Sequence, residues 1–347
     1  MNLSDCFQKF IIIAIRNCIP KSENIVNITT QNKFSSGIRI LSAVVLLAVI
    51  TAGCGSGGQQ KLDETPTRGN IRILVDESFQ PLIDTEVYTF TSLYQNAFIE
   101  PLYMPEVDVV NQFMRDTARV MVTSRKLTED QIAWLKEQLI VVRSVAFAWD
   151  ALALITNKDN HDTLMTFNNV ADIFKGRVTQ WKELDNKSKL GKISVIFDNT
   201  KSGNIRYFKE RFEISDTLGS NFFAVNSNAE VIEFVSRNPD ALGIISVNWV
   251  SDKHDPQSTM FLSRVNVLAI EQEFSTDGSY YRPYQGFIAD KSYPFVREVY
   301  MTSRETFTGL GLGFIQWATG EQGQRIVLKS GLVPANMPIR LVQIRTE

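Results

Sequence analysis

Strand-like and helix-like segments alternate along most of the chain, and this alternation constrains the fold more than any other feature of the sequence. Short apolar runs that predict strands occupy residues 71–75, 118–123, 151–156, 193–197 and 241–246. Segments with helical spacing or with helix-start signals lie between these runs. Strands that alternate with helices are typical of βαβ units with mostly parallel pairing. We therefore expect an α/β protein.

Several helix starts carry local signals. Pro81 closely follows the first predicted strand and suits the first turn of a helix. Thr128 and Gln131 have the spacing of a capping box. Residues 204–212 and 229–237 are predicted to be helical, the latter from the spacing of its apolar side chains. The predicted helices thus begin close to the ends of predicted strands.

Serine stands at three of the junctions between a strand and the region that follows it. The three junctions are Ser78-Phe79, Ser124-Arg125 and Ser202-Gly203-Asn204. A serine at a helix start is most often an N-cap. Helix N-termini that follow the strands of an open sheet also present unpaired N–H groups to anions. Three such junctions together predict a site of neutral donors that suits an oxyanion.

The composition excludes several kinds of site. The 347 residues are 44% hydrophobic and 21% charged, which suits two soluble units, and a net charge of −2 gives no sign of a nucleic-acid partner. His161 and His254 lie far apart and have no cysteine near them, so a zinc site of the usual spacing is excluded and each is expected on the surface or in a turn. The three cysteines all precede residue 55, so the rest of the chain has no cysteine nucleophile. We expect no catalytic residues, no metal and no cofactor.

The first 53 residues have the pattern of a targeting segment. Lys33 and Arg39 precede an apolar run at residues 40–52, which is shorter than the ~20 residues that span a membrane and suits a secretory signal. The run ends in Ala52-Gly53-Cys54, which resembles the lipobox of bacterial lipoproteins, in which the cysteine is acylated. The alternative is a short membrane anchor or a buried helix. We expect a lipoprotein signal peptide with an N-terminal extension at 1–53, lipid attachment at Cys54, a flexible tether at 54–68 and a membrane-anchored location in the periplasm or cell envelope.

A longer motif lies at residues 167–184. Its distinctive positions are Asp172-Ile173-Phe174, Gly176 and Thr179-Gln180-Trp181. This pattern resembles a signature of the phosphate-binding periplasmic proteins, the receptors of phosphate ABC transporters. Residues 198–204, 241–246, 293–300 and 323–334 resemble further elements of that family in the same order. From the residues themselves, Val170, Ile173 and Phe174 share one helical face and Trp181 packs beneath the turn, so this motif is expected to be structural.

The resemblance implies a type II periplasmic-binding-protein fold. Two α/β lobes, with two mixed sheets flanked by helices, would be joined by two hinge crossings near Thr156 and Arg264. Lobe 1 would comprise residues 69–156 and 265–347, and lobe 2 residues 157–264. The implied function is that of a lipid-anchored, monomeric receptor that captures inorganic phosphate between the lobes for an ABC permease, without a cofactor or nucleic acid.

The resemblance also implies a ligand site, carried residue by residue. Its members would be Ser78, Phe79, Ser124, Arg125, Ser202, Gly203 and Asn204. Asp198 stands where the family has an arginine, and Glu106 begins a segment that replaces a donor-rich loop. The family's acceptor aspartate falls at residues 123–125, where Arg125 offers a cation instead and is expected to replace the missing arginine.

The acids at these positions leave alternatives open. An unpaired carboxylate beside a phosphate dianion costs several kcal/mol, so Asp198 and Glu106 point away, pair with Arg125, or mark a different ligand. Lys201 and Arg206 are interpreted as solvated helix charges.

The alternative functions are a binding module for another oxyanion, or a non-transport sensor or adhesion role with a weakened phosphate site. An exported hydrolase is disfavoured because neither histidine has the context of a serine triad.

Overall fold

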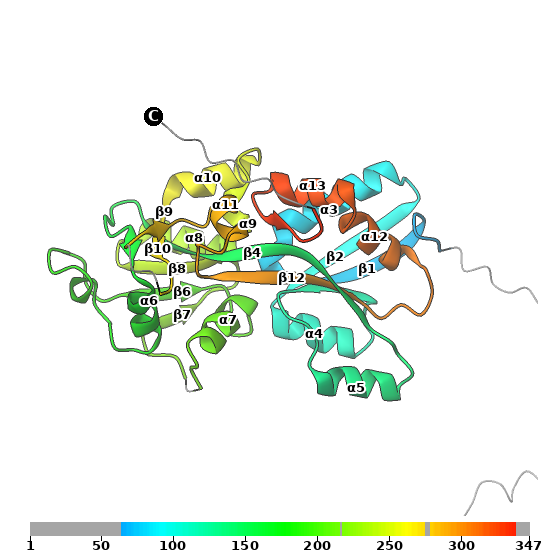
Figure 1. Cartoon of the computed structure of the whole chain (residues 1–347), viewed down its shortest axis with the longest axis horizontal. Helices are drawn as coiled ribbons and strands as arrows, with labels where there is room; N and C mark the ends of the chain where they lie inside the picture. Colours follow the sequence, from blue (N-terminus) through cyan, green and yellow to red (C-terminus); the bar gives the residue numbers. More distant parts are fainter. Residues whose placement is uncertain (1–63, 216, 275–277, 338–347) are drawn as a thin grey trace, which may run out of the picture. The chain divides into compact units, whose positions relative to one another are not determined.

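A single long strand, β4 (Arg143–Asn157), joins the two halves of a ten-stranded sheet (Figure 1). The computed structural model describes residues 64–215, 217–274 and 278–337. Up to Ala151, β4 pairs with β12 (Val296–Ser303), and from Leu152 onward it pairs with β8 (Ala241–Ser246). The change of partner between Ala151 and Leu152 divides the strands into what we call the first sheet and the second sheet.

The first sheet has the strand order β2-β1-β3-β12-β4. β1 (Gly69–Asp76) is parallel to β2 (Ala97–Met104) and to β3 (Val120–Thr123), whereas β12 is antiparallel to β3 and β4. The short β13 (Val333–Pro334) also pairs with β4. The helices of this part are α3 (Gln80–Leu93), α4 (Glu106–Met114), α5 (Glu129–Glu137), α12 (Leu310–Ala318) and α13 (Glu321–Lys329), with the 3-10 turn η1 (Glu77–Phe79).

The second sheet continues from β4 in the order β8-β6-β7. β6 (Ser194–Phe197) is parallel to β7 (Phe222–Ala224) and β8, and β9 (Val265–Val267) pairs with the end of β4. A small third sheet joins β5 (Leu164–Met165), β10 (Ala269–Glu271) and β11 (Tyr280–Tyr281). The helices here are α6 (Phe167–Phe174), α7 (Gly203–Arg211), α8 (Asn228–Arg237), α9 (Asn248–Ser251), α10 (Pro256–Arg264) and α11 (Gln285–Ala289), with the 3-10 turn η2 (Trp181–Glu183).

The α/β class and most local predictions are confirmed. β8 has the predicted bounds, Pro81 lies in the first turn of α3, and Thr128 and Gln131 form the capping box that begins α5. The signature helix buries Val170, Ile173 and Phe174 as expected. Trp181 is fully buried, and its indole N–H donates to the carbonyl of Asp240 at 3.0 Å. His161 and His254 are exposed outside the helices and strands.

Two features differ from the expectations. Parallel pairing holds within the βαβ units, but every pairing made by β4 and β12 is antiparallel, and β4 continues from the first sheet into the second. Glu64, placed in the predicted tether, accepts two hydrogen bonds from Arg119 at 2.8 and 2.9 Å, so this end of the tether is packed on the fold.

The lobe boundaries stay a prediction, and the strand pairing suggests how to refine them. β9 begins at Val265 and still pairs with β4 beyond Leu152, which is further along the chain than the predicted crossing near Arg264. The chain rejoins the first sheet at β12. We therefore propose crossings at Ala151–Leu152 and immediately before Val296.

Candidate functional site

Two strand ends from different sheets face one another and define the candidate site. β1 ends at Asp76 and continues into η1, whose Ser78 and Phe79 are fully buried. β6 ends at Phe197, and α7 begins after Ser202, whose hydroxyl accepts the N–H of Asn204 as an N-cap. In open α/β sheets the carboxyl ends of strands and the helix starts beyond them are the usual ligand sites.

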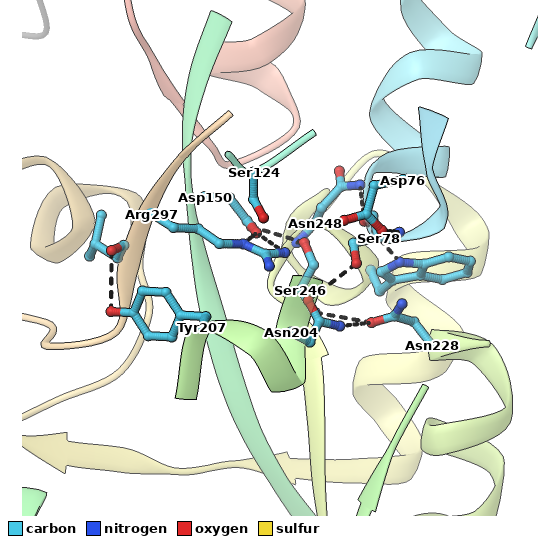
Figure 2. Close-up of polar contacts among 12 residues, drawn as sticks. Asp76, Ser78, Ser124, Asp150, Asn204, Tyr207, Asn228, Ser246, Asn248 and Arg297 are labelled. Atoms are coloured by element: carbon cyan, nitrogen blue, oxygen red, sulfur yellow. Dashed lines mark hydrogen bonds and ion pairs between the residues drawn. The ribbon is translucent and has the colours of Figure 1, made fainter. Parts of the chain in front are cut away.

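A chain of side-chain amides and hydroxyls connects these ends (Figure 2). Ser78 Oγ donates to Asn204 Oδ1 at 3.2 Å, and Asn204 Nδ2 donates to Asn228 Oδ1 at 3.2 Å. Asn228 Oδ1 also accepts the N–H of Ser246 at 3.1 Å. On the other side, Asn248 Nδ2 donates to the carbonyl of Ser78 at 3.3 Å. The first and second sheets are thus in direct hydrogen-bonded contact at this point.

Arg297 on β12 supplies a buried cation beside this network. Its Nε donates to Asp150 Oδ2 at 2.9 Å, and Asp150 Oδ1 accepts from Ser246 Oγ at 2.9 Å. The guanidinium carbon lies 5.1 Å from the centre of the Phe79 ring. Nη1 and Nη2 make no hydrogen bond within the described residues, although Nη2 is 2.9 Å from Asp150 Oδ2. Nη1 is therefore a buried donor without a hydrogen-bond partner among the described residues, and Nη2 contacts only Asp150.

Glu106, the first residue of α4, forms a second cluster with residues from both sheets. Its carboxylate accepts from Ser124 Oγ at 2.6 Å and from the Ser124 N–H at 3.1 Å. Arg206 of α7 donates through Nε to the same carboxylate at 2.5 Å, and Arg125 Nε lies 3.8 Å from it. Burial favours the neutral acid, but the hydrogen bonds and charge of Arg206, with Ser124 and Arg297, outweigh it and hold the pKa of Glu106 below its usual range.

The other carboxyls near the site behave in the opposite way. Burial, reinforced by the charge of Glu106 and opposed by Arg297, raises the pKa of Asp76 to about 8. Burial likewise raises the pKa of Glu77 to about 7 and that of Asp198 to about 6, against hydrogen bonds from Asn228 and Ser202 respectively. Asp76 Oδ2 has no hydrogen-bond partner among the described residues. Near pH 7 Asp76 is therefore mostly protonated, whereas Asp198 is mostly ionised.

Five of the predicted site residues come together here. Ser78, Phe79, Ser202, Gly203 and Asn204 are all buried at the two facing strand ends. A Cβ built on Gly203 would lie 2.8 Å from Asp76 Oδ2 and from Ser124 Oγ, and 2.9 Å from Glu106 Oε2, so the α7 N-terminus approaches the first sheet closely.

The remaining predicted residues have other surroundings. The hydroxyl of Ser124 donates to Glu106, and Arg125 Nε lies 3.8 Å from the same carboxylate. Of the alternatives left open, pairing is the one seen for Glu106, with Arg206 as its principal partner and Arg125 as a second. Asp198 instead accepts from Ser202 Oγ at 2.6 Å. Cys54 lies outside the described residues.

Sequence reasoning missed the two most informative arginines. Arg206 was interpreted as a solvated helix charge, which is wrong, because its guanidinium joins α7 to Glu106 and to Ser124 Oγ at 2.9 Å. Lys201 is half-exposed and pairs with Asp108 at 2.9 Å. Arg297 was not considered; the available signal was a single arginine at a buried position of β12, where its neighbour Val299 is also buried.

Two further kinds of site find no support within residues 64–337 as described. No group of three or more His, Cys, Asp or Glu side chains there is arranged to hold a metal ion. In the same part of the chain no helix is long and apolar enough to cross a membrane.

Comparison with known proteins identifies the family. Residues 63–322 match the family model described as the PBP superfamily domain. The chain belongs to the PBP superfamily. The fold agrees with this family. A solved structure from Clostridium perfringens, described as a putative phosphate ABC transporter substrate-binding protein with bound phosphate, superposes with a TM-score of 0.64 at 24% identity. The match covers 77% of this chain and 100% of that one. A phosphate transport receptor from Vibrio cholerae gives a TM-score of 0.58 at 20% identity, over 77% of this chain and 100% of that one.

Curated relatives of this PBP-superfamily chain point the same way. The phosphate-binding protein PstS of Borreliella burgdorferi is 23% identical over 73% of this chain and 85% of its own length. The PstS of Pseudomonas aeruginosa is 22% identical over 77% of this chain and 83% of its own length. The two-lobed, type II periplasmic-binding-protein architecture expected from the sequence is thereby confirmed.

Proposed function

We propose that this protein is an extracytoplasmic solute-binding protein that captures inorganic phosphate between its two sheets for an ABC importer, and that it is not an enzyme. The observation that carries the proposal is the buried contact of the α7 N-terminus with η1 through Asn204 and Ser78, beside the guanidinium of Arg297 that lies over the Phe79 ring. Relatives named phosphate-binding proteins support the same ligand. Backbone N–H groups at a helix start and a bidentate arginine are the usual ligands of phosphate.

The binding residues we propose are those of the two strand ends together with the newly found cation. They are Ser78, Phe79, Ser202, Gly203, Asn204 and Arg297. Ser78 and Asn204 already bond to each other, so phosphate would have to exchange that contact for bonds to its own oxygens. Attachment to the membrane through a lipid on Cys54, a permease partner and a monomeric state complete the proposal.

Isothermal titration with phosphate, sulfate and molybdate tests this function. We expect phosphate to bind and Arg297→Lys to weaken it at least about tenfold, because lysine keeps the charge but loses the planar pair of donors. Arg237→Lys, in an exposed pair with Glu233, is the matched control and should leave the affinity unchanged. Absence of phosphate binding at millimolar concentration would refute the proposal.

A second function is favoured by the carboxylates. Asp76, Glu77, Glu106 and Asp198 are all buried or nearly so around the same point, and those that are ionised near pH 7, Glu106 and most of Asp198, oppose an anion. A sensor or adhesion module with a weakened phosphate site fits this surplus. The two are distinguished by thermal unfolding: a ligand at about 100 times its Kd adds about 2.7 kcal/mol of stability, whereas the second function predicts no shift with phosphate.

A further inference from the structure

A groove of about 700 Å³ lies away from the candidate site. α9, α10, β9 and α11 line one part of it, and the end of α13 lines another. Figure 1 shows α10, α11 and α13 on one side of the long strands β4 and β12, with α4 and α7 on the other. The residues that line the groove include none of those proposed to bind phosphate. The volume falls within the ~300–1,000 Å³ that is usual for small-molecule sites.

The groove is lined by positive charge without any acid. Lys158, Lys253, Arg282 and Lys329 lie on its walls together with His254, and none of its lining residues is Asp or Glu. The three lysines are exposed and have no ion pair or side-chain hydrogen bond with any other described residue. In the candidate site, by contrast, each arginine already has a carboxylate partner. The lysines therefore present uncompensated charge to whatever enters the groove.

The walls between these charges are apolar. Val247, Val250 and Val265 are buried beneath the groove surface. Leu262 and Tyr284, at 41% and 58% exposure, are large apolar side chains left accessible to solvent beside it. Inorganic phosphate would pair with the lysines but leave these apolar walls exposed to water. An occupant that satisfies both has an acidic head group and an apolar body.

We propose that this groove is a second ligand site, which binds a small organic anion through the lysines and packs the apolar body of that anion against Leu262 and Tyr284. A concave groove of this volume suits a small molecule better than a flat protein partner. The proposal is independent of phosphate capture, because the two sites share no residue and the classes of ligand differ.

The aromatic sulfonate anilinonaphthalene sulfonate is the probe for this site, followed by its fluorescence on titration into the folded protein. We expect saturable binding at one site that millimolar phosphate does not displace. The uncharged analogue phenylnaphthylamine should bind at least about tenfold more weakly, because it lacks the charge that the lysines recognise. Failure of the sulfonate to bind, or equal binding of the neutral analogue, would overturn the proposal.

Charge reversal locates the binding. Lys158→Glu combined with Lys329→Glu should weaken the sulfonate about tenfold or more. The control combines Lys136→Glu with Lys187→Glu, two exposed lysines outside the groove that give the same change in net charge. Circular dichroism and thermal unfolding verify that both variants stay folded, since the probe also binds partly folded states that expose hydrophobic surface. Equal effects of the two pairs, or no effect of the first, would show that the groove is not the site.

Discussion

The two helices that face each other across the candidate site begin in opposite ways. α7 begins with Ser202 and Gly203, so its N-terminus offers neutral donors. α4 begins with Glu106, whose own carboxylate accepts the bonds that a bound anion would accept. Both N-termini carry the positive end of a helix dipole. The α7 start thus brings neutral hydroxyl and amide groups to the site, which bond to Asp198 and Asn228, whereas the α4 start brings a carboxylate that bonds to Ser124 and Arg206.

This difference explains how a buried acid stays ionised here. Glu106 is completely buried, yet its pKa is lowered, since Arg206 reaches it from the opposite sheet. Asp76 is equally buried but has an unpartnered oxygen, and its pKa is raised to about 8. The hydrogen-bond and ion-pair partners of a buried carboxyl group, more than its degree of burial, decide whether it stays ionised.

The largest effect on the free energy of unfolding is expected from removing Arg206, the ion-pair partner of the ionised Glu106. Arg206→Met leaves Glu106 buried with only the more distant Arg125, and loss of one member of a buried pair costs roughly 3–5 kcal/mol. The free energy of unfolding from urea titration measures this. Adding Glu106→Gln to the same chain should recover much of the loss, because the unpaired charge is then gone.

An exposed ion pair provides the control for Arg206. Arg237 pairs with Glu233 within α8, at side-chain exposures of 72% and 49%. Arg237→Met should change stability by no more than about 0.5 kcal/mol. Similar losses of stability in the two variants would mean that the buried pair of Glu106 with Arg206 stabilises the fold no more than an exposed ion pair does.

The next largest effect is expected where α7 approaches the first sheet closely, at Gly203. Gly203→Ala places a methyl group 2.8–2.9 Å from oxygens of Asp76, Ser124 and Glu106, so the two sheets must separate at this point. Overpacking of this kind costs about 1–3 kcal/mol, and we expect phosphate affinity to fall about tenfold or more. Gly191→Ala, whose new Cβ would meet Asp240 at 3.4 Å, is the control. Unchanged phosphate affinity in Gly203→Ala would argue against binding between the sheets.

The sequence predicts the fold and the α7 side of the site for local reasons. Apolar runs, the capping signals of Thr128 and the order Ser202-Gly203-Asn204 are read from neighbouring residues, and each was confirmed in the structure as an element or a cap. The long antiparallel β4 was not predicted, because no local signal shows that a strand changes partner at Ala151.

The α4 side could not be predicted in the same way. Arg206 and Glu106 are 100 residues apart, and Arg297 and Asp150 are 147 apart. Pairs at such separations meet only after both sheets have formed. A charge on a helix is usually solvated, so the exceptional role of Arg206 depends on a tertiary contact that the pattern of α7 does not contain.

The protonated acids predict a pH dependence. Asp76, Glu77 and Asp198 have folded-state pKa values of about 8, 7 and 6, against ordinary values of 3.8, 4.5 and 3.8. The folded state then binds more protons than the unfolded state, so these groups stabilise the fold fully below about pH 4 and lose that contribution as the pH rises toward about 8.

Urea unfolding between about pH 5 and pH 8 tests this, with each group contributing a slope of at most about 1.4 kcal/mol per pH unit. Glu106 has a lowered pKa and stays ionised throughout this window, so it adds no slope. Asp76→Asn should flatten the curve in its upper part. Stability that rises steadily over the window would contradict the assigned protonation and with it the contrast between the two clusters.

The smallest effect concerns the N-cap that keeps the α7 donors in place. Ser202 Oγ accepts the N–H of Asn204 at 2.9 Å and donates to Asp198 Oδ1 at 2.6 Å. Ser202→Ala should cost about 1 kcal/mol of stability and also weaken phosphate binding, because the helix start loses its cap and the ligand loses a hydroxyl. Thr166→Ala removes an equivalent cap, on the N–H of Asn169 at 3.0 Å in α6, away from the site. It should cost similar stability while leaving phosphate affinity unchanged. Parallel losses of affinity in both variants would mean that Ser202 acts only through the stability of its helix, and that its hydroxyl is not a ligand of phosphate.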